Sequence, residues 1–171
     1  MTVADLKKLE NEIKMEKEEP KMISLFGEPV YWLVSYDGNF TARQLADRHY
    51  SRETKGSKQF VGAGEKIVLL SPDGKAVFAW LRSKPEYRLD HIDGVNCTIF
   101  RNESSVLSSK LILEAEKFAR EKWPGLKLFT YVNKEKVQSK NPGWCFMKAG
   151  WKLAGENKSG KLRLLFKEGV E

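Results

Sequence analysis

The residue types best suited to acid–base chemistry gather in residues 48–60, RHYSRETKGSKQF. This stretch holds His49, one of two histidines in the chain, directly before Tyr50 and Ser51. An unperturbed imidazole titrates near neutral pH, so His49 is suited to move a proton under physiological conditions. Either His49, Tyr50 and Ser51 do chemistry on an anionic partner, or the stretch is an ordinary polar connection.

Basic side chains surround this stretch and recur nearer the C-terminus. Residues 43–66 hold six basic and three acidic residues, and residues 133–163 hold eight basic and two acidic residues. The chain carries a net charge of +7 at neutral pH. Such a basic chain favours polyanions, either nucleic acid or a phosphorylated cofactor. The alternative is a lysine-rich surface that is simply solvated.

The elements that must position these residues follow from turn signals and apolar periodicity. Residues 41–50 predict a short helix with Thr41 as its N-cap, which places His49 at the C-terminal end. The turn SPDGK joins two apolar runs into a hairpin, because Asp-Gly accepts the left-handed conformation. The strands predicted in all are 28–36, 66–70, 76–82, 94–101, 126–132, 151–155 and 161–168.

The strongest helical pattern covers residues 106–122. Its apolar face comprises Leu107, Leu111, Ala115 and Phe118. Ser104 or Ser105 is expected to cap its start, and Glu116 and Arg120 form an i,i+4 pair. A second, short helix is predicted within residues 141–150, with Pro142 just inside its start.

The order of these elements predicts one α/β domain over residues 21–171, with a mixed, mostly antiparallel central sheet flanked by helices. Residues 1–20 predict a helical extension. No apolar run reaches the roughly 18 residues of a membrane span, and the N-terminus lacks the apolar core of a signal peptide. We therefore expect a cytoplasmic protein without a membrane partner. Cys97 and Cys145 are too few for a disulfide framework and fit a reducing compartment.

The order strand, long helix, strand, short helix, strand resembles the GNAT acyltransferase superfamily over roughly residues 30–168. A narrower resemblance rests on four segments in the same order: RHYS (48–51), FRNES and LSS (100–109), YVN (131–133) and NPGWCFMKAGW (141–151). These look like the Mom family of phage-type DNA modification proteins, which alter the exocyclic amine of adenine in duplex DNA. The resemblance implies a GNAT-like fold and a group transfer to adenine.

The same resemblance implies acetyl-CoA or a related acyl donor, with its pyrophosphate at the start of the 106–122 helix, where amides and macrodipole favour an anion. The residues implied for the donor are Arg101, Asn102, Ser108, Ser109, Asn141, Cys145 and Phe146. The chain departs from the superfamily in two places. RNESSVLSS has no glycine, and Phe146 stands where many of these enzymes have a tyrosine that protonates the leaving thiolate. Tyr131 is one candidate to replace that tyrosine, and Cys145 is the next. The resemblance thus implies His49, Tyr50, Ser51 and Tyr131 as the catalytic residues.

A base inside duplex DNA must leave the stack before it can react, and Tyr50 could stack on it. The residues predicted to hold the double-stranded DNA are Arg48, Arg52, Lys55, Lys58, Lys134, Lys136 and Lys140. No metal is predicted, and the oligomeric state is left open, with a homodimer as one option. All of this requires residues 48–51 and 101–109 to converge on one crevice.

Two alternatives stay open at this point. One is a conventional acetyl-CoA-dependent N-acetyltransferase that acts on a small amine or a protein. The other is a non-enzymatic nucleic-acid-binding protein on a degenerate GNAT scaffold.

Overall fold

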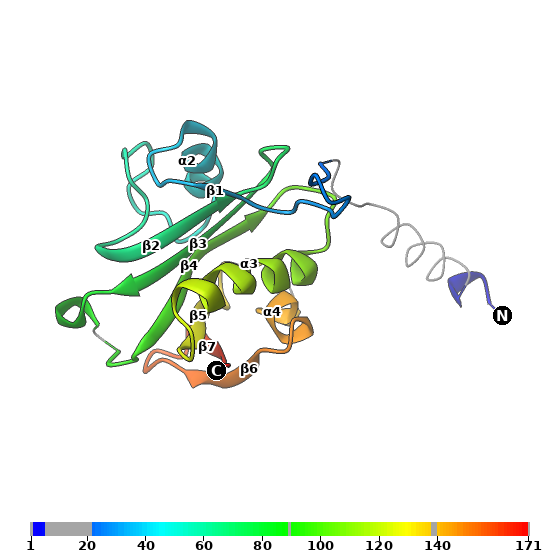
Figure 1. Ribbon diagram of the computed structural model, residues 1–171. Coiled ribbons are helices and arrows are strands. Elements are labelled where there is room, and N and C mark those ends of the chain that lie inside the picture. Colours follow the sequence, from blue (N-terminus) through cyan, green and yellow to red (C-terminus); the bar gives the residue numbers. More distant parts are fainter. Residues whose placement is uncertain (1, 6–21, 89, 138–139, 171) are drawn as a thin grey trace.

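The structure, a computed structural model (Figure 1), describes residues 2–5, 22–88, 90–137 and 140–170. The helix predicted over residues 1–20 lies almost entirely outside these ranges. Within them, no helix combines the length and the apolar character needed to cross a bilayer.

The centre of the fold is a sheet that contains seven strands among the described residues, in the order β1-β2-β3-β4-β5-β7-β6. The strands are β1 (Leu33–Ser35), β2 (Gly64–Leu70), β3 (Ala76–Ser83), β4 (Gly94–Asn102), β5 (Lys127–Asn133), β6 (Lys152–Glu156) and β7 (Leu162–Lys167). Only β4 and β5 run parallel within this sheet. The prediction of a mixed, mostly antiparallel sheet is therefore confirmed.

Helices α2 (Phe40–Asp47), α3 (Ser108–Lys122) and α4 (Trp144–Lys148) cover the two faces of the sheet. The 3₁₀ helix η1 (Pro85–Tyr87) lies in the connection between β3 and β4 and has no buried residue. Helix α3 is the crossover that joins the parallel strands β4 and β5, as such a pair requires, and it lies across one face (Figure 1). Leu111 and Ala115 of α3 pack there with Trp80 of β3. Helix α2 covers the other face, where Leu45 packs with Val68 and Ile99.

Strand β4 changes its character at Thr98. The register of β3 against β4 skips this residue, because Ala79 opposes Ile99 whereas Trp80 opposes Cys97. Thr98 is thus the extra residue of a β-bulge, which disturbs the alternation of side chains. Cys97 joins the core on the α3 side, and Ile99 joins the core on the α2 side.

The two parallel strands separate just beyond this bulge. Strands β4 and β5 pair over only four positions, from Gly94↔Lys127 to Cys97↔Thr130, although β4 continues to Asn102 and β5 to Asn133. From there on β5 keeps its antiparallel partner β7. The described residues therefore form a sheet that is split at its centre, because no ladder joins β4 to β5 beyond Cys97 and Thr130.

Several local predictions are wrong in instructive ways. Asn39, not Thr41, caps α2 by accepting a hydrogen bond from the amide of Ala42 (3.0 Å). Helix α3 begins at Ser108 with Leu107 as N-cap and no side-chain cap. Pro142 precedes α4 because Gly143, at φ 84°, is the N-cap. Only Asn39 satisfies a backbone amide with its side chain, whereas Leu107 and Gly143 provide no side-chain cap.

The expected Glu116–Arg120 pair is replaced by contacts that are distant in sequence. Glu116 is buried and accepts hydrogen bonds from Lys167 of β7 (2.8 Å) and from the indole of Trp151 (2.7 Å). Arg120 donates instead to the carbonyls of Leu126 and Glu168. Helical spacing identifies neighbours on the helix surface, but a carboxylate on the buried side finds its partner in the sheet.

Candidate functional site

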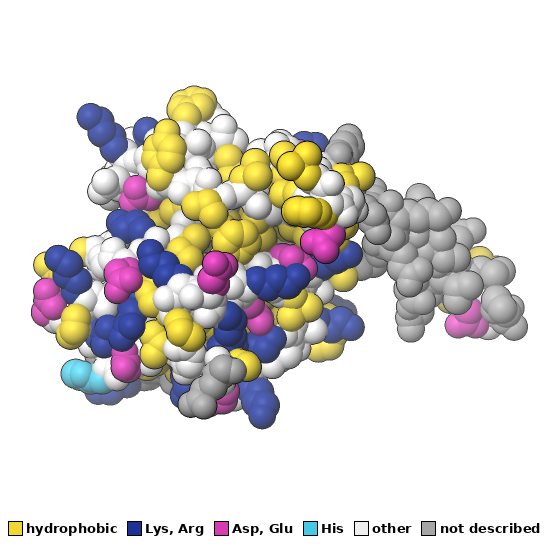
Figure 2. Space-filling model, in the orientation of Figure 1, with side chains coloured by type: hydrophobic (Ala, Val, Ile, Leu, Met, Phe, Trp, Pro, Cys, Tyr) yellow, Lys and Arg dark blue, Asp and Glu magenta, His cyan; other side chains and the backbone are white. Residues whose placement is uncertain are grey.

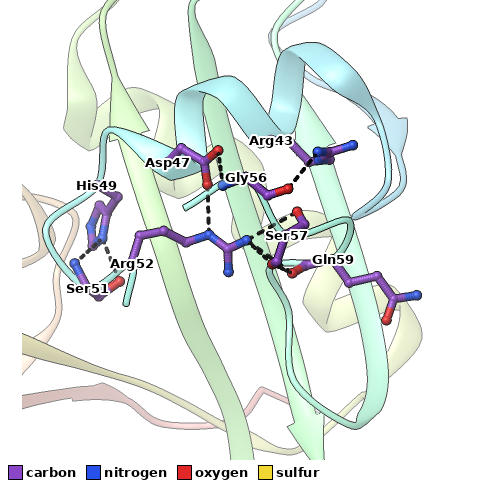
Figure 3. Close-up of polar contacts among 8 residues, drawn as sticks. All are labelled: Arg43, Asp47, His49, Ser51, Arg52, Gly56, Ser57 and Gln59. Atoms are coloured by element: carbon purple, nitrogen blue, oxygen red, sulfur yellow. Dashed lines mark hydrogen bonds and ion pairs between the residues drawn. The ribbon is translucent and has the colours of Figure 1, made fainter. Parts of the chain in front are cut away.

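The loop after α2 is held in place by its own arginine. Arg52 donates from Nε to Asp47 (2.9 Å) and from Nη2 to Ser57 and to the carbonyl of Gln59 (3.1 Å), as Figure 3 shows. Asp47 also accepts from the amide of Gly56 (2.9 Å). The Arg52 side chain is 10% exposed, so its guanidinium serves the loop, and the predicted contact with DNA phosphates stays a prediction.

A second cluster ties this loop to the end of β4. Glu103 accepts a two-point interaction from Arg48 (2.8 and 2.9 Å) and also binds Arg101, which in turn donates to the carbonyl of Arg48 (2.8 Å). These hydrogen bonds lower the pKa of the Glu103 carboxyl to about 2, Arg48 having the larger effect. We call Arg48, Arg101 and Glu103 the arginine clamp. It brings residues 48–51 and 101–103 together, as the crevice hypothesis required.

His49 lies beside the clamp with a defined tautomer. Its Nδ1 faces the Ser51 hydroxyl at 2.7 Å and accepts from the Ser51 backbone amide (3.2 Å), so in the neutral ring the proton resides on Nε2. Burial, and then the charge of Arg101, lower the pKa of His49 to about 4. The prediction assumed a pKa near neutrality. In the structure the ring is instead firmly neutral at pH 7.

Tyr50 connects the same loop to the end of β5. Its ring stacks on His49 with centroids 4.4 Å apart, and its hydroxyl accepts a hydrogen bond from the Asn133 amide (3.2 Å). Tyr131 lies two residues before Asn133 on β5, and its hydroxyl donates to Asp90 (2.7 Å). Burial and the Asp90 carboxylate raise the pKa of Tyr131. A tyrosine in that state holds its proton, and here the proton points toward Asp90.

A cavity of about 130 Å³ lies in the gap between β4 and β5, on the side of α4. We call it the α4-side cavity. His49 and Tyr50 line it together with Thr98, Tyr131, Cys145 and Phe146. Burial raises the pKa of both thiols, Cys97 and Cys145, which keeps them protonated. Phe146 is 5% exposed and packs against Trp151, so it supplies apolar wall and no proton.

The start of α3 leaves its first amides without a side-chain cap. Asn102 organises the preceding turn: its amide nitrogen donates to Ser108 Oγ (3.0 Å), and its oxygen accepts from Ser104. Ser108 therefore accepts through its oxygen, and its own O–H donates to no other residue in the part of the chain that the structure describes. Residues 101, 102, 108 and 109, which were predicted to bind the acyl donor, lie close together. Most of the Arg101 guanidinium, however, is engaged in hydrogen bonds of the clamp.

On the other side of the gap, a hollow of about 450 Å³ opens beneath the loop. We call it the α2-side hollow. Tyr50, Ser51, Thr98 and Tyr131 line it, and Lys136 stands at its wall. Tyr50, Thr98 and Tyr131 line the α4-side cavity as well. The α4-side cavity and the α2-side hollow therefore share Tyr50, Thr98 and Tyr131 as part of their walls.

The remaining predicted residues are more scattered. Lys55, Lys58, Lys136 and Lys140 are exposed, and Lys134 pairs with Glu156 (2.5 Å). On the face that carries α3, basic and acidic side chains alternate without forming one basic field (Figure 2). Asn141 accepts from Arg163 (3.2 Å), behind the start of α4. Their roles with DNA and donor stay predictions.

Three residues of the site were not predicted. Glu103 is the common partner of two arginines, Thr98 is the bulge residue shared by both spaces, and Asp90 holds Tyr131. A lone acid between basic residues was a signal for Glu103, but a bulge leaves no mark in the sequence. Within the described ranges, no group of three His, Cys, Asp or Glu residues is placed to hold a metal ion.

The chain was compared with family models, with curated proteins and with solved structures, and none of the three comparisons gave a match.

Proposed function

We propose that this chain is a GNAT-like, Mom-like transferase that modifies the exocyclic amine of adenine in DNA. The observation that carries the proposal is the split between β4 and β5, with a space on each side that the same residues line. A group transfer needs two ligands that approach one another through a common wall. Tyr50, Thr98 and Tyr131 form such a wall here.

The α4 side suits an acyl donor that carries phosphates. The uncapped amides of α3 and the free hydroxyl proton of Ser108 are donors for an anion. The arginine clamp adds one net positive charge nearby. An acyl donor, when bound, supplies an activated carbon and its leaving group. The absence of glycine in residues 101–109 fits a donor whose phosphates contact side chains and helix amides more than a glycine loop.

The loop side suits the acceptor. The amine of adenine is a weak nucleophile because its lone pair is delocalised into the ring, but bond formation places a positive charge on the nitrogen and makes its two N–H protons strongly acidic, one of which must leave. A weak base then suffices to remove it. Ser51 can receive that proton and pass its own to Nδ1 of His49, which is neutral and proton-free at pH 7. His49 and Ser51 therefore act as a relay, with the Nε2–H group left to donate a hydrogen bond.

Nucleoside analysis tests the proposal directly. DNA from cells that express the chain is digested to nucleosides and analysed by mass spectrometry, beside DNA from cells that express the Ser51→Ala variant. We expect a deoxyadenosine of increased mass with the wild type and about a hundredfold less with the variant. The mass increment identifies the transferred group.

The two alternatives predict different outcomes. An N-acetyltransferase leaves deoxyadenosine unchanged and is stabilised against heat by acetyl-CoA without DNA. A DNA-binding protein without activity leaves the nucleosides unchanged and binds DNA in a salt-dependent way that survives His49→Ala. An unmodified nucleoside profile from well-expressed, folded protein would falsify the transferase proposal.

A further inference from the structure

Two polar atoms of β4 lie buried without partners where the strand leaves β5. Asn96 and Thr98 alternate with Val95 and Cys97, whose side chains face the α3 core. Nothing within the described ranges forms a hydrogen bond with Asn96 Oδ1 or Thr98 Oγ1. Buried side-chain oxygens in proteins nearly always have a partner, so an exception calls for an explanation.

Asn96 stands between two open spaces. It lines the α2-side hollow and also a second hollow of about 540 Å³ next to η1. We call the latter the η1-side hollow. Tyr87, Phe129 and Tyr131 give it an aromatic lining, and Tyr131 belongs to both hollows. Tyr87 is 61% exposed, which leaves its ring open to a ligand. The hydrogen bond from Tyr131 to Asp90 fixes the Tyr131 ring.

We propose that these two hollows form a nucleobase-binding site, in which the carboxamide of Asn96 recognises a base with an exocyclic amino group. The inference rests on the proposed function and names the subsite of its acceptor. A carboxamide offers one acceptor and one donor side by side, and adenine presents one amino donor beside one ring-nitrogen acceptor. The Asn χ2 torsion is broad, so a rotation brings the shielded oxygen to the hollow.

The placement also explains how the amine would reach the relay. Ser51 and Asn96 line the same hollow. An amino group has two N–H bonds, so one can donate to Asn96 while the other faces Ser51. The aromatic rings provide stacking for the extruded base, and Lys136 at the wall meets the phosphate beside it.

Equilibrium binding of single-stranded oligonucleotides tests the inference without any acyl donor. One oligonucleotide carries a central deoxyadenosine among thymidines, and the matched one carries a central purine deoxynucleoside that lacks the amino group. We expect wild-type protein to bind the first about tenfold more tightly. Asn96→Leu is expected to lose this preference and to keep its affinity for the amine-free strand.

A second variant guards against an effect on folding. Asn96→Asp keeps an oxygen acceptor, so it is expected to retain a preference for deoxyadenosine although both strands bind more weakly to the added negative charge. Equal binding of both strands by the wild type, or an unchanged preference in Asn96→Leu, overturns the inference. Because the assay needs no turnover, a protein that modifies adenine but shows equal binding retains the proposed function and loses this subsite. A protein that discriminates between the two strands but transfers no group retains this subsite, and only the proposed transferase function is overturned.

Discussion

At the residue scale, the protonation state of His49 decides whether the site can accept a proton from the acceptor amine. Its pKa is lowered to about 4 by burial first and by the Arg101 charge second. We expect NMR titration of the His91→Asn variant, which leaves one histidine, to give a midpoint near pH 4. Arg101→Gln is expected to raise it, whereas Lys152→Gln, at an exposed position on β6, leaves it unchanged. A midpoint above pH 6 would contradict the burial of the ring.

The same pKa sets the direction of an acid effect on stability. The imidazole binds a proton more readily in the unfolded chain, with an ordinary pKa of 6.5, than in the folded one. Folding stability therefore falls as pH drops from 6.5 through about 4, and it is unaffected above that window. Urea unfolding at several pH values measures this. His49→Gln is expected to remove this part of the acid dependence, so the gap between the variant and the wild type changes only below pH 6.5.

Ser51 gives a sharper test of the relay than His49, because its side chain contributes little to packing. Ser51→Ala removes the hydroxyl that faces Nδ1 at 2.7 Å. We expect about a hundredfold slower modification with unchanged DNA affinity. Ser105→Ala, an exposed serine before α3, is the matched control and keeps full activity. Equal rates in both variants would assign the Ser51–His49 contact to loop structure alone.

The sequence could identify the chemical types at the site but not their pairing. His49, Tyr50 and Ser51 stand out by composition, and the structure places them at the gap between β4 and β5. The partner of Arg48 is Glu103, 55 positions away. Interactions at that separation follow from the path of the sheet, so no local pattern reveals them. The low pKa of His49 depends on the same packing.

At the element scale, the arginine clamp fastens the loop after α2 to β4. Its arginines lower the pKa of Glu103 to about 2, from 4.5 in an unfolded chain. The clamp therefore stabilises the fold above about pH 4.5, and this contribution is lost as pH falls toward 2. Because the side chains are partly exposed, we expect Glu103→Gln to cost about 1 kcal/mol at pH 7. Urea unfolding should show the difference shrinking below pH 4.5. A constant difference at all pH values would rule out the ionised form as its origin.

Gly143 determines how α4 enters the site. It adopts φ 84°, and a Cβ there would lie 2.4 Å from Leu165 Cδ1. Gly125 adopts a similar φ of 78° with open space around it. We expect Gly125→Ala to lose about 1–2 kcal/mol from backbone strain alone, and Gly143→Ala to lose clearly more because Leu165 must move. Urea unfolding compares the two. Equal losses of unfolding free energy in the two variants would show that the Leu165 side chain moves aside at no measurable cost.

Element types were predictable because periodicity and turn residues are local signals, whereas element ends were not. Thr41, Ser104 and Pro142 are all suitable residues for a helix start. The structure uses Asn39, Leu107 and Gly143 instead. Ser104 Oγ accepts instead from the Val106 amide (3.2 Å) and donates to Asn102, in the turn before α3. The hydrogen bonds of the preceding turn therefore decide where this helix begins.

At the scale of the whole molecule, the strand succession was predictable and the split was not. The hairpins and the helical crossover place β1 to β5 side by side in chain order, whereas β7 rather than β6 pairs with β5. The separation of β4 from β5 begins at the Thr98 bulge and depends on what packs on either side. The site is therefore a property of the assembled sheet. Its stability depends on the contacts that hold the β6–β7 half to α3.

One ion pair, with a buried carboxylate and a half-buried ammonium, makes that connection. Glu116 of α3 is 7% exposed and binds Lys167 of β7 (2.8 Å), which also donates to the carbonyl of Ala149 after α4 (2.8 Å). Glu116→Ala leaves the Lys167 ammonium, whose side chain is 27% exposed, without its carboxylate, so we expect a cost of about 1–3 kcal/mol. Replacing both partners, in Glu116→Leu with Lys167→Met, removes both charges and should recover much of that loss.

Urea unfolding of Glu116→Leu, of Lys167→Met and of the double variant gives the coupling between the side chains. Strong coupling would mean that the pair acts as a unit that holds β7, and through it β5, at the distance from β4 that keeps the gap open. Additive losses would mean that each side chain contributes separately, and the spacing of the split strands would then depend on the apolar packing of Trp80 and Trp151.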